Sequence, residues 1–245
     1  GINRENIVVL PFGGDFIKLY DVLRNELIAL PFVENVSASY DLPFFLTSGV
    51  GLTWEGADEE DAFGVSYNMV DYDFIETMEI EMLEGRSFSR AYASDDSIAY
   101  IINEAALERM GMEKASGLNV RFTHPHLPAH LREGRIIGVV KDFNIRPLRE
   151  EIRPLVLRIY RPFYRHLYIK YTGNPSEILS YLEKMQAQLV PGLPFQYSFL
   201  QEEFDLIYEV EYRTARIIKY FTIIIIIISC LGLFGMTLYD LQLRS

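Results

Sequence analysis

Near its C-terminus the chain carries 20 consecutive uncharged residues, YFTIIIIIISCLGLFGMTLY, running from Tyr220 to Tyr239. An α-helix rises about 1.5 Å per residue, so this segment is long enough to cross the roughly 30 Å hydrocarbon core of a bilayer. Tyrosines stand at both ends, where amphipathic rings favour the headgroup region. The segment therefore predicts a transmembrane helix, in which Cys230 is a small apolar residue. A buried core helix of a soluble protein is the alternative interpretation.

The residues around this segment bear on its orientation. A secretory signal is excluded, because such signals are N-terminal. The chain begins with Gly1 and ends six residues after Tyr239, so we expect a piece of a longer membrane protein. Three basic residues precede the segment within 213–219, and only Arg244 follows it. Taken alone, this bias mildly favours a cytoplasmic location for the preceding domain.

The composition indicates a folded, acidic domain ahead of the apolar segment. The 245 residues are 49% hydrophobic and 23% charged, which is enough for a real core and excludes a disordered chain. Asp and Glu outnumber Lys and Arg by 34 to 23, a formal net charge of −11, so nucleic acid is not an expected partner. The single cysteine excludes an internal disulfide framework and any multi-cysteine metal site.

Two strand–helix–strand patterns, far apart in the sequence, frame the domain. Helical spacing of apolar residues follows Asp15, a candidate helix cap, and stops at Pro31. The same order returns after residue 166, with Pro175 opening the helix. Together the patterns predict an α+β fold with a split βαβ, ferredoxin-like lobe. The expected elements are a strand at 7–10, a helix at 16–30, strands at 33–39 and 167–171, a helix at 175–189 and a strand at 195–200.

The stretch between these patterns is expected to form a second α+β lobe inserted into the first. Its clearest elements are strands at 63–69, 98–102, 118–122 and 135–140 and helices at 72–78 and 103–110.

The join to the apolar segment is free of helix breakers. No Gly or Pro occurs between Ser198 and Cys230, and apolar positions such as Phe204, Ile207 and Ile218 fall on one helical stripe. A single helix of about 60 Å could therefore run from Leu200 through the bilayer. The alternative is a flexible stalk, but such stalks are usually rich in Gly, Ser or Pro.

Catalytic and phosphate-binding motifs are missing. The sequence has no P-loop, nucleophile elbow, zinc-protease helix or dinucleotide fingerprint. Asp71 and Asp73 begin like a calcium loop, but Glu76 stands where that loop needs glycine. We therefore expect no enzyme activity in this chain, no catalytic or cofactor-binding residues, no metal ligands and no cofactor.

Three charged features invite weaker binding hypotheses. His124, His126 and His130 in HPHLPAH could bind zinc, although a solvated loop is the preferred interpretation because prolines separate them. The basic and aromatic run from Lys141 to Arg165 is expected to be a solvated face whose Arg stems cover apolar surface. A patch facing lipid headgroups or a partner is the alternative there. The acidic cluster at 58–61 is expected to be a loop tip.

Several stretches of the sequence resemble the extracytoplasmic domain of MacB/FtsX-type ABC transporter permeases, in the family's order. They are DFIETMEIEMLEGRSFSR (73–90), AYIINEAALERMG (99–111), GRIIGVVKDFNIRPLREEIRPLVL (134–157), FLQEEFDLIYEVEYRTARIIKYF (199–221) and ISCLGLFGM (228–236). The resemblance implies a porter-like lobe from 1–45 and 150–215 and an inserted, Sabre-like lobe from 46–149. It also implies a transmembrane helix at 220–239 and the start of a cytoplasmic segment at 240–245.

The resemblance further implies a function. The chain would be the non-enzymatic periplasmic part of a permease in the bacterial inner membrane, against the mild charge bias, coupling cytoplasmic ATP hydrolysis to periplasmic conformational change. Implied partners are an ATP-binding subunit, a second permease copy in a homo- or heterodimer, membrane lipid, and periplasmic or outer-membrane proteins. A membrane-anchored periplasmic sensor that binds a ligand is the alternative, and an anchored hydrolase or metalloenzyme is a third hypothesis.

Overall fold

A computed structural model describes residues 2–44, 46, 49–123, 128–143, 152–189, 192 and 194–243. The chain divides into two compact units, Gly1–Gln201 and Glu202–Ser245. The expected mixture of helices and strands is confirmed in the first unit, and the second unit is helical.

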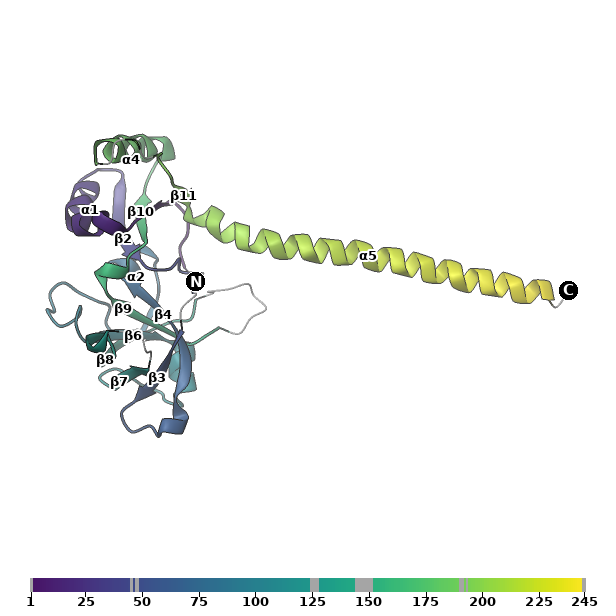
Figure 1. Ribbon diagram of the computed structural model, residues 1–245, viewed down its shortest axis with the longest axis horizontal. Coiled ribbons are helices and arrows are strands. Elements are labelled where there is room, and N and C mark those ends of the chain that lie inside the picture. The colour runs from purple at the N-terminus through teal and green to yellow at the C-terminus, as the bar shows by residue number, and fades with distance from the viewer. Residues whose placement is uncertain are drawn as a thin grey trace. The chain divides into compact units, whose positions relative to one another are not determined.

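Four strands of the first unit form an antiparallel sheet in the order β11-β1-β10-β2 (Figure 1). The strands are β1 (Ile7–Pro11), β2 (Val33–Ser39), β10 (His166–Tyr171) and β11 (Ser198–Phe199). Strands from the beginning and the end of the domain therefore alternate, as in a split βαβ arrangement. We call this sheet and its two helices, α1 and α4, the sheet lobe.

The two helices share one apolar core with the sheet. Both α1 (Tyr20–Ile28) and α4 (Pro175–Leu189) bury one stripe of side chains against alternate strand residues. The predicted helix at 175–189 is confirmed. The predicted helix at 16–30 is α-helical only from Tyr20, because its first turns are the 3-10 helix η1 (Gly14–Leu19). Gly13 occupies the N-cap position of η1 without a side-chain hydrogen bond, and the side chain of Asp15 lies outside the described residues.

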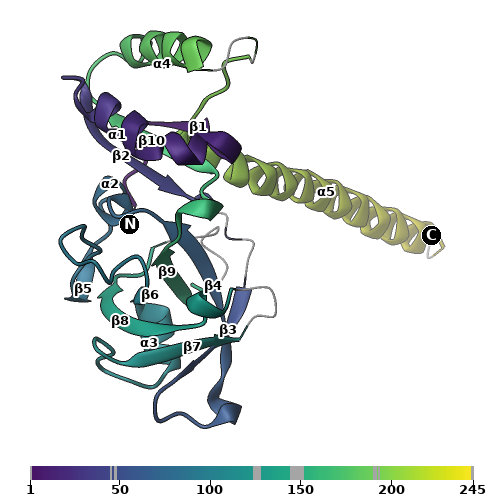
Figure 2. The same ribbon diagram turned by 60° about the vertical axis from the view of Figure 1, so that its left-hand side comes forward.

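Six further strands close into a ring, which we call the barrel (Figure 2). The order is β4-β3-β7-β8-β6-β9, and β9 pairs back to β4 in parallel. Because every strand has two neighbours, no edge of the ring is left open. The strands are β3 (Gly49–Trp54), β4 (Phe63–Val70), β6 (Ala99–Asn103), β7 (Asn119–Thr123), β8 (Glu133–Val140) and β9 (Leu155–Ile159).

The barrel contains elements that the periodicity did not predict. These are β3, β9 and the short β5 (Met82–Gly85), which pairs with β8. Strand β9 falls in the range 150–215 expected for the porter-like lobe, yet it pairs with β4 and β6. We therefore count β9 with the barrel. The predicted helices at 72–78 and 103–110 are present but shorter, as α2 (Phe74–Thr77) and α3 (Glu104–Arg109).

Arg158 on β9 is a buried cation, only 2% exposed. Its guanidinium donates to the Tyr100 hydroxyl and to the carbonyl oxygens of Ser97 and His130, while Nε has no hydrogen-bond partner among the described residues. Burial lowers the pKa of Arg158 to about 10, so the side chain is still charged at neutral pH. The expectation of a solvated face is therefore wrong for this residue. Arg158 instead ties β9 to two loops of the barrel.

The second unit consists of helix α5 (Leu200–Leu243), which begins in the residue directly after β11. Its 44 residues confirm the prediction of one uninterrupted helix from Leu200. Leu200 itself is fully buried. Among the residues whose side chains are described, no helix has a stretch both long and apolar enough to cross a membrane.

Gly85 provides a test of the close pairing of β5 with β8. Its φ is +71°, and a Cβ there would lie 2.2 Å from the carbonyl oxygen of Ile137. Gly111 has a φ of +68° but nothing within 4 Å of such a Cβ. We expect Gly111→Ala to lower the free energy of unfolding by about 1 kcal/mol, the cost of a left-handed alanine. Gly85→Ala should cost roughly 1–3 kcal/mol more, because the strands must also move apart.

Denaturant unfolding of both variants measures the difference. Equal losses would contradict the close approach of the two strands at Gly85.

Candidate functional site: the junction between the lobes

The chain leaving β4 places two aspartates, Asp71 and Asp73, against the sheet lobe. β4 is hydrogen-bonded to β2 of the sheet lobe through the single pair Ser39–Val70. Immediately after this pair the chain turns into α2, and the two carboxylates contact side chains of α1 and β2. We call this group of contacts the junction.

Asp71 is the buried centre of the junction, with 1% of its surface exposed. The Tyr20 hydroxyl of α1 donates to one carboxylate oxygen, and Ser37 Oγ of β2 donates to the other at 2.5 Å. Burial raises the pKa of Asp71 to about 6, and the neighbouring Asp73 carboxylate adds to the rise, although both hydroxyl donors oppose it. Burial and Asp71 also raise the pKa of Tyr20 far above its usual value, so Tyr20 stays a donor.

Asp73 is the ionic centre of the junction. It accepts from Nε of Arg24 at 2.6 Å and from both terminal nitrogens of Arg90 at 2.7 Å. Arg24 belongs to α1, whereas Arg90 lies in the chain between β5 and β6 of the barrel. Burial opposes ionisation of Asp73, but the hydrogen bonds from the two arginines outweigh it and hold the pKa below its ordinary value.

Further polar contacts surround these two carboxylates. Arg161, in the connection from β9 to β10, makes a two-bond ion pair with Asp21 of α1 at 2.7 and 2.8 Å. The Tyr164 hydroxyl donates to the carbonyl oxygen of Val70 at 2.9 Å. A cavity of about 280 Å³ opens beside these residues. The arginines that line it, Arg90 and Arg161, already have carboxylate partners.

The arrangement is suited to holding the two lobes together. Both carboxylates have strong donors, and charge-assisted, bidentate pairs are geometrically the most specific hydrogen bonds in proteins. A buried network that is fully satisfied makes a contact rigid. No group of three or more potential metal ligands converges among the described residues.

The histidines, the acidic cluster and the basic run that the sequence analysis considered as binding features do not form one site among the described residues. His124 and His126 lie outside the described residues, while His130 is exposed in the 3-10 helix η3 (Ala129–Leu131). In the acidic cluster at 58–61, Asp58, Glu60 and Asp61 are exposed, as a loop tip predicts, and the cluster contains the 3-10 helix η2 (Glu59–Asp61).

The basic run from Lys141 to Arg165 is not one surface. Lys141 pairs with Glu81 in solvent, Arg161 belongs to the junction, and the Arg165 guanidinium lies 4.5 Å from the ring centre of Tyr40. Arg146 and Arg149 fall outside the described residues.

The aspartates of the junction were missed by sequence reasoning, which considered Asp71 and Asp73 only as a failed calcium loop. Their spacing carries no signal of a lobe contact, because their partners lie between 17 and 51 positions away in the sequence. Three of these partners, Tyr20, Arg24 and Ser37, lie in the predicted first βαβ unit, and no local pattern marks them.

Comparison with solved structures identifies the fold. The chain is similar to the periplasmic region of MacB from Actinobacillus actinomycetemcomitans, with a TM-score of 0.57 and 13% identity over 84% of this chain and 94% of that one. A domain described as part of a permease protein from Porphyromonas gingivalis aligns with a TM-score of 0.55 and 17% identity, covering 80% of this chain and 89% of that one.

A third similar structure is the extracellular domain of the noncanonic ABC-type transporter YknZ from Gram-positive bacteria. It aligns with a TM-score of 0.51 and 14% identity over 78% of this chain and 97% of that one. No protein-family model matches the chain, and no curated protein matches it. The chain thus has the fold of extracytoplasmic domains of ABC-type transporters, as the sequence resemblance predicted.

Replacing Asp73 tests the ionic part of the junction. We expect Asp73→Asn to lower the free energy of unfolding by about 2–4 kcal/mol, because two arginines lose their partner in a partly buried place. The matched control is Glu133→Gln, which breaks an ion pair whose side chains are 67–68% exposed and should cost at most about 0.5 kcal/mol. Urea unfolding compares the two. Similar losses in both variants would show that the junction is no stronger than a surface pair.

Asp71 should make stability depend on pH in the direction opposite to an ordinary carboxylate. The folded protein binds a proton at Asp71 with a pKa of about 6, whereas the ordinary pKa of the carboxyl, which applies when it is exposed in the unfolded chain, is 3.8. Folding therefore takes up a proton between these values, and stability rises as the pH falls from about 7 to about 4, by roughly 2 kcal/mol from this group. Other carboxylates titrate in both proteins, so the difference between wild type and Asp71→Asn isolates the effect.

Thermal unfolding at several pH values measures this difference. The stabilisation of wild type relative to Asp71→Asn should grow as the pH is lowered through 6. A difference that is constant from pH 7 to pH 4 would contradict the raised pKa of Asp71.

Proposed function

We propose that this chain is the extracytoplasmic domain of an ABC transporter permease that passes conformational change between the membrane and the periplasm. The single observation that supports this most is the shared fold, which extends over most of the chain and nearly the whole periplasmic region of MacB. The sequence resemblance supports the same conclusion.

In this proposal the apolar segment from Tyr220 to Tyr239 is the membrane span. The described side chains of Ile223, Ile224, Ile225, Ile226 and Ile228 are each 45–62% exposed on α5. A run of exposed isoleucines on one helix needs an apolar environment, which a bilayer supplies. The domain would then lie in the periplasm of a bacterium and be held in the inner membrane by this helix.

The covalent connection supports mechanical coupling. Because α5 follows β11 without a linker and its first residue is buried, a displacement of the helix acts directly on β11. β11 is paired with β1 through Val8–Phe199 and Val9–Ser198. The junction would then carry the displacement from the sheet lobe to the barrel, so that both lobes move as one body.

The other components of the transporter are proposed partners of this chain. Nothing in this chain is expected to hydrolyse ATP, so an ATP-binding subunit and a second permease copy would complete the transporter. We also propose that the sheet lobe corresponds to the porter-like lobe and the barrel to the inserted lobe. Periplasmic or outer-membrane proteins would contact these lobes, and the transporter would use nucleotide-driven switching between two arrangements of similar energy.

Crosslinking in membranes that contain the full-length protein and its partners tests the proposal. Cysteine pairs placed on the periplasmic lobes of neighbouring copies should crosslink differently with and without ATP and vanadate. Thr214→Pro should remove this nucleotide dependence while ATP hydrolysis continues, because proline interrupts the helix that carries the motion. Thr214→Ala keeps the helix and should behave as wild type.

Crosslinks that never respond to nucleotide would reject mechanical coupling and favour the periplasmic sensor instead. A Thr214→Pro variant that retains the full nucleotide response would reject α5 as the connection while leaving the permease assignment intact.

A further inference from the structure

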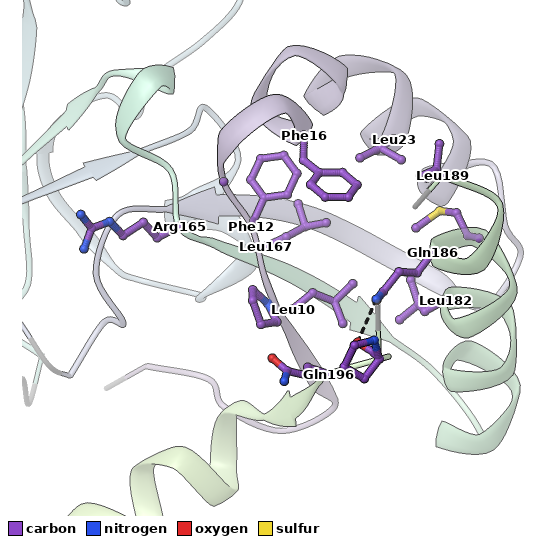
Figure 3. Close-up of a pocket in the computed structure, with 14 residues that line it drawn as sticks. Leu10, Phe12, Phe16, Leu23, Arg165, Leu167, Leu182, Gln186, Leu189 and Gln196 are labelled. Atoms are coloured by element: carbon purple, nitrogen blue, oxygen red, sulfur yellow. Dashed lines mark hydrogen bonds between the residues drawn. The ribbon is translucent and has the colours of Figure 1, made fainter. Parts of the chain in front are cut away.

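A second place in the sheet lobe has the properties of a binding site and is separate from the junction. It is a cavity of about 390 Å³ between α1 and α4, above the sheet (Figure 3). Leu10 of β1 and Leu167 of β10 form its floor, with Phe16 and Leu23 on one side and Leu182 on the other. These side chains offer no hydrogen-bond partners, so water in the cavity would be poorly held.

Among the described residues that line the cavity, one side chain is charged, and it does not face the cavity. In Figure 3 the guanidinium of Arg165 points away, and it lies over the ring of Tyr40. The uncharged polar side chains at the cavity are Gln186 and Gln196, both at the same end, although in Figure 3 the amide of Gln196 points away from that of Gln186. Gln186 is held in place, because its Nε2 donates to the carbonyl oxygen of Pro194 at 3.0 Å.

These features select a ligand class. A charged group would lose its hydration without gaining a counter-charge. A peptide segment would bring backbone N–H and C=O groups that the leucine and phenylalanine walls cannot satisfy. An alkyl chain has no such groups, and a neutral polar head could lie at the end of the cavity where Gln186 and Gln196 are.

The dimensions agree with one chain. The lining positions on α4 run from Leu182 to Leu189, which at about 1.5 Å per residue is roughly 10 Å along the helix. At about 30 Å³ per non-hydrogen atom, the volume of a water in the liquid, the cavity has room for about a dozen atoms.

We propose that this cavity binds the alkyl chain of a neutral amphiphile, with the polar head at Gln186 and Gln196. The site does not depend on the transporter assignment, because it belongs to the packing of the sheet lobe alone.

Photolabelling of the full chain in lipid nanodiscs tests the proposal. The probe is an 8-carbon alcohol with a diazirine in its chain, and labelled peptides are mapped by mass spectrometry. We expect labelling of peptides from η1, α1 and α4, and competition by unlabelled octanol. The matching carboxylic acid probe should label these peptides at least about tenfold less, since its charge finds no partner.

Leu189→Trp is the blocking variant, because Leu189 lines the cavity yet is 41% exposed, so a larger ring fits at its opening. The matched control is Val22→Trp on α1, which is 62% exposed and does not line the cavity. Labelling should fall at least about tenfold in Leu189→Trp and stay unchanged in Val22→Trp. If Leu189→Trp fails to fold, Phe16→Trp narrows the cavity from the opposite side.

Two results would overturn the proposal. One is equal labelling of η1, α1 and α4 in wild type and in a folded blocking variant. The other is labelling confined to peptides within 220–239, which would show that the probe only dissolves in the bilayer. Stronger labelling by the acid than by the alcohol would replace the neutral head with an anionic one and also contradict the site as described.

Discussion

A carboxylate can remain in a protein interior only where donors replace its hydration, and at Asp71 those donors come from another part of the chain. The Tyr20 and Ser37 hydroxyls belong to α1 and β2, whereas Asp71 directly follows β4 of the barrel. A shift of one lobe against the other that kept Asp71 buried would therefore remove its hydrogen-bond donors. This requirement, together with the Asp73 ion pairs, keeps the barrel in one orientation on the sheet lobe.

The barrel itself needs a strand from late in the sequence. Its ring is complete only when β9 pairs with β4 and β6, and the chain then continues through Arg161 into β10 of the sheet lobe. Closure thus leaves the entering and leaving chains side by side at the junction. A lobe inserted in this way is held at both of its ends, which suits the proposed transfer of motion from α5 through β11.

Local patterns predicted the elements whose burial follows a simple period. Helix α4 was found because Ile178, Leu182 and Met185 repeat at helical spacing, and β7 alternates between buried and exposed residues. Strand β9 was missed because it lies within the basic run from Lys141 to Arg165 and contains Arg158, so that stretch was interpreted as a solvated face. Strand β5 is only four residues long, and the first turns of the predicted helix at 16–30 follow Gly13 as a 3-10 helix.

The sequence alone predicts the uncharged segment and the uninterrupted helix that leads into it. It also predicts the two βαβ units and shows the family resemblance. These features depend on neighbours within a few positions, where spacing and side-chain type decide the outcome. The junction and the apolar cavity are different in kind. Asp71 bonds Ser37 across 34 positions, and the cavity is lined by Leu10 of β1 and Leu182 of α4, so both exist only once distant segments have packed. The spacing of apolar residues along the sequence does not predict such contacts. It indicates that one face of a helix or strand is buried, but not which other element covers that face.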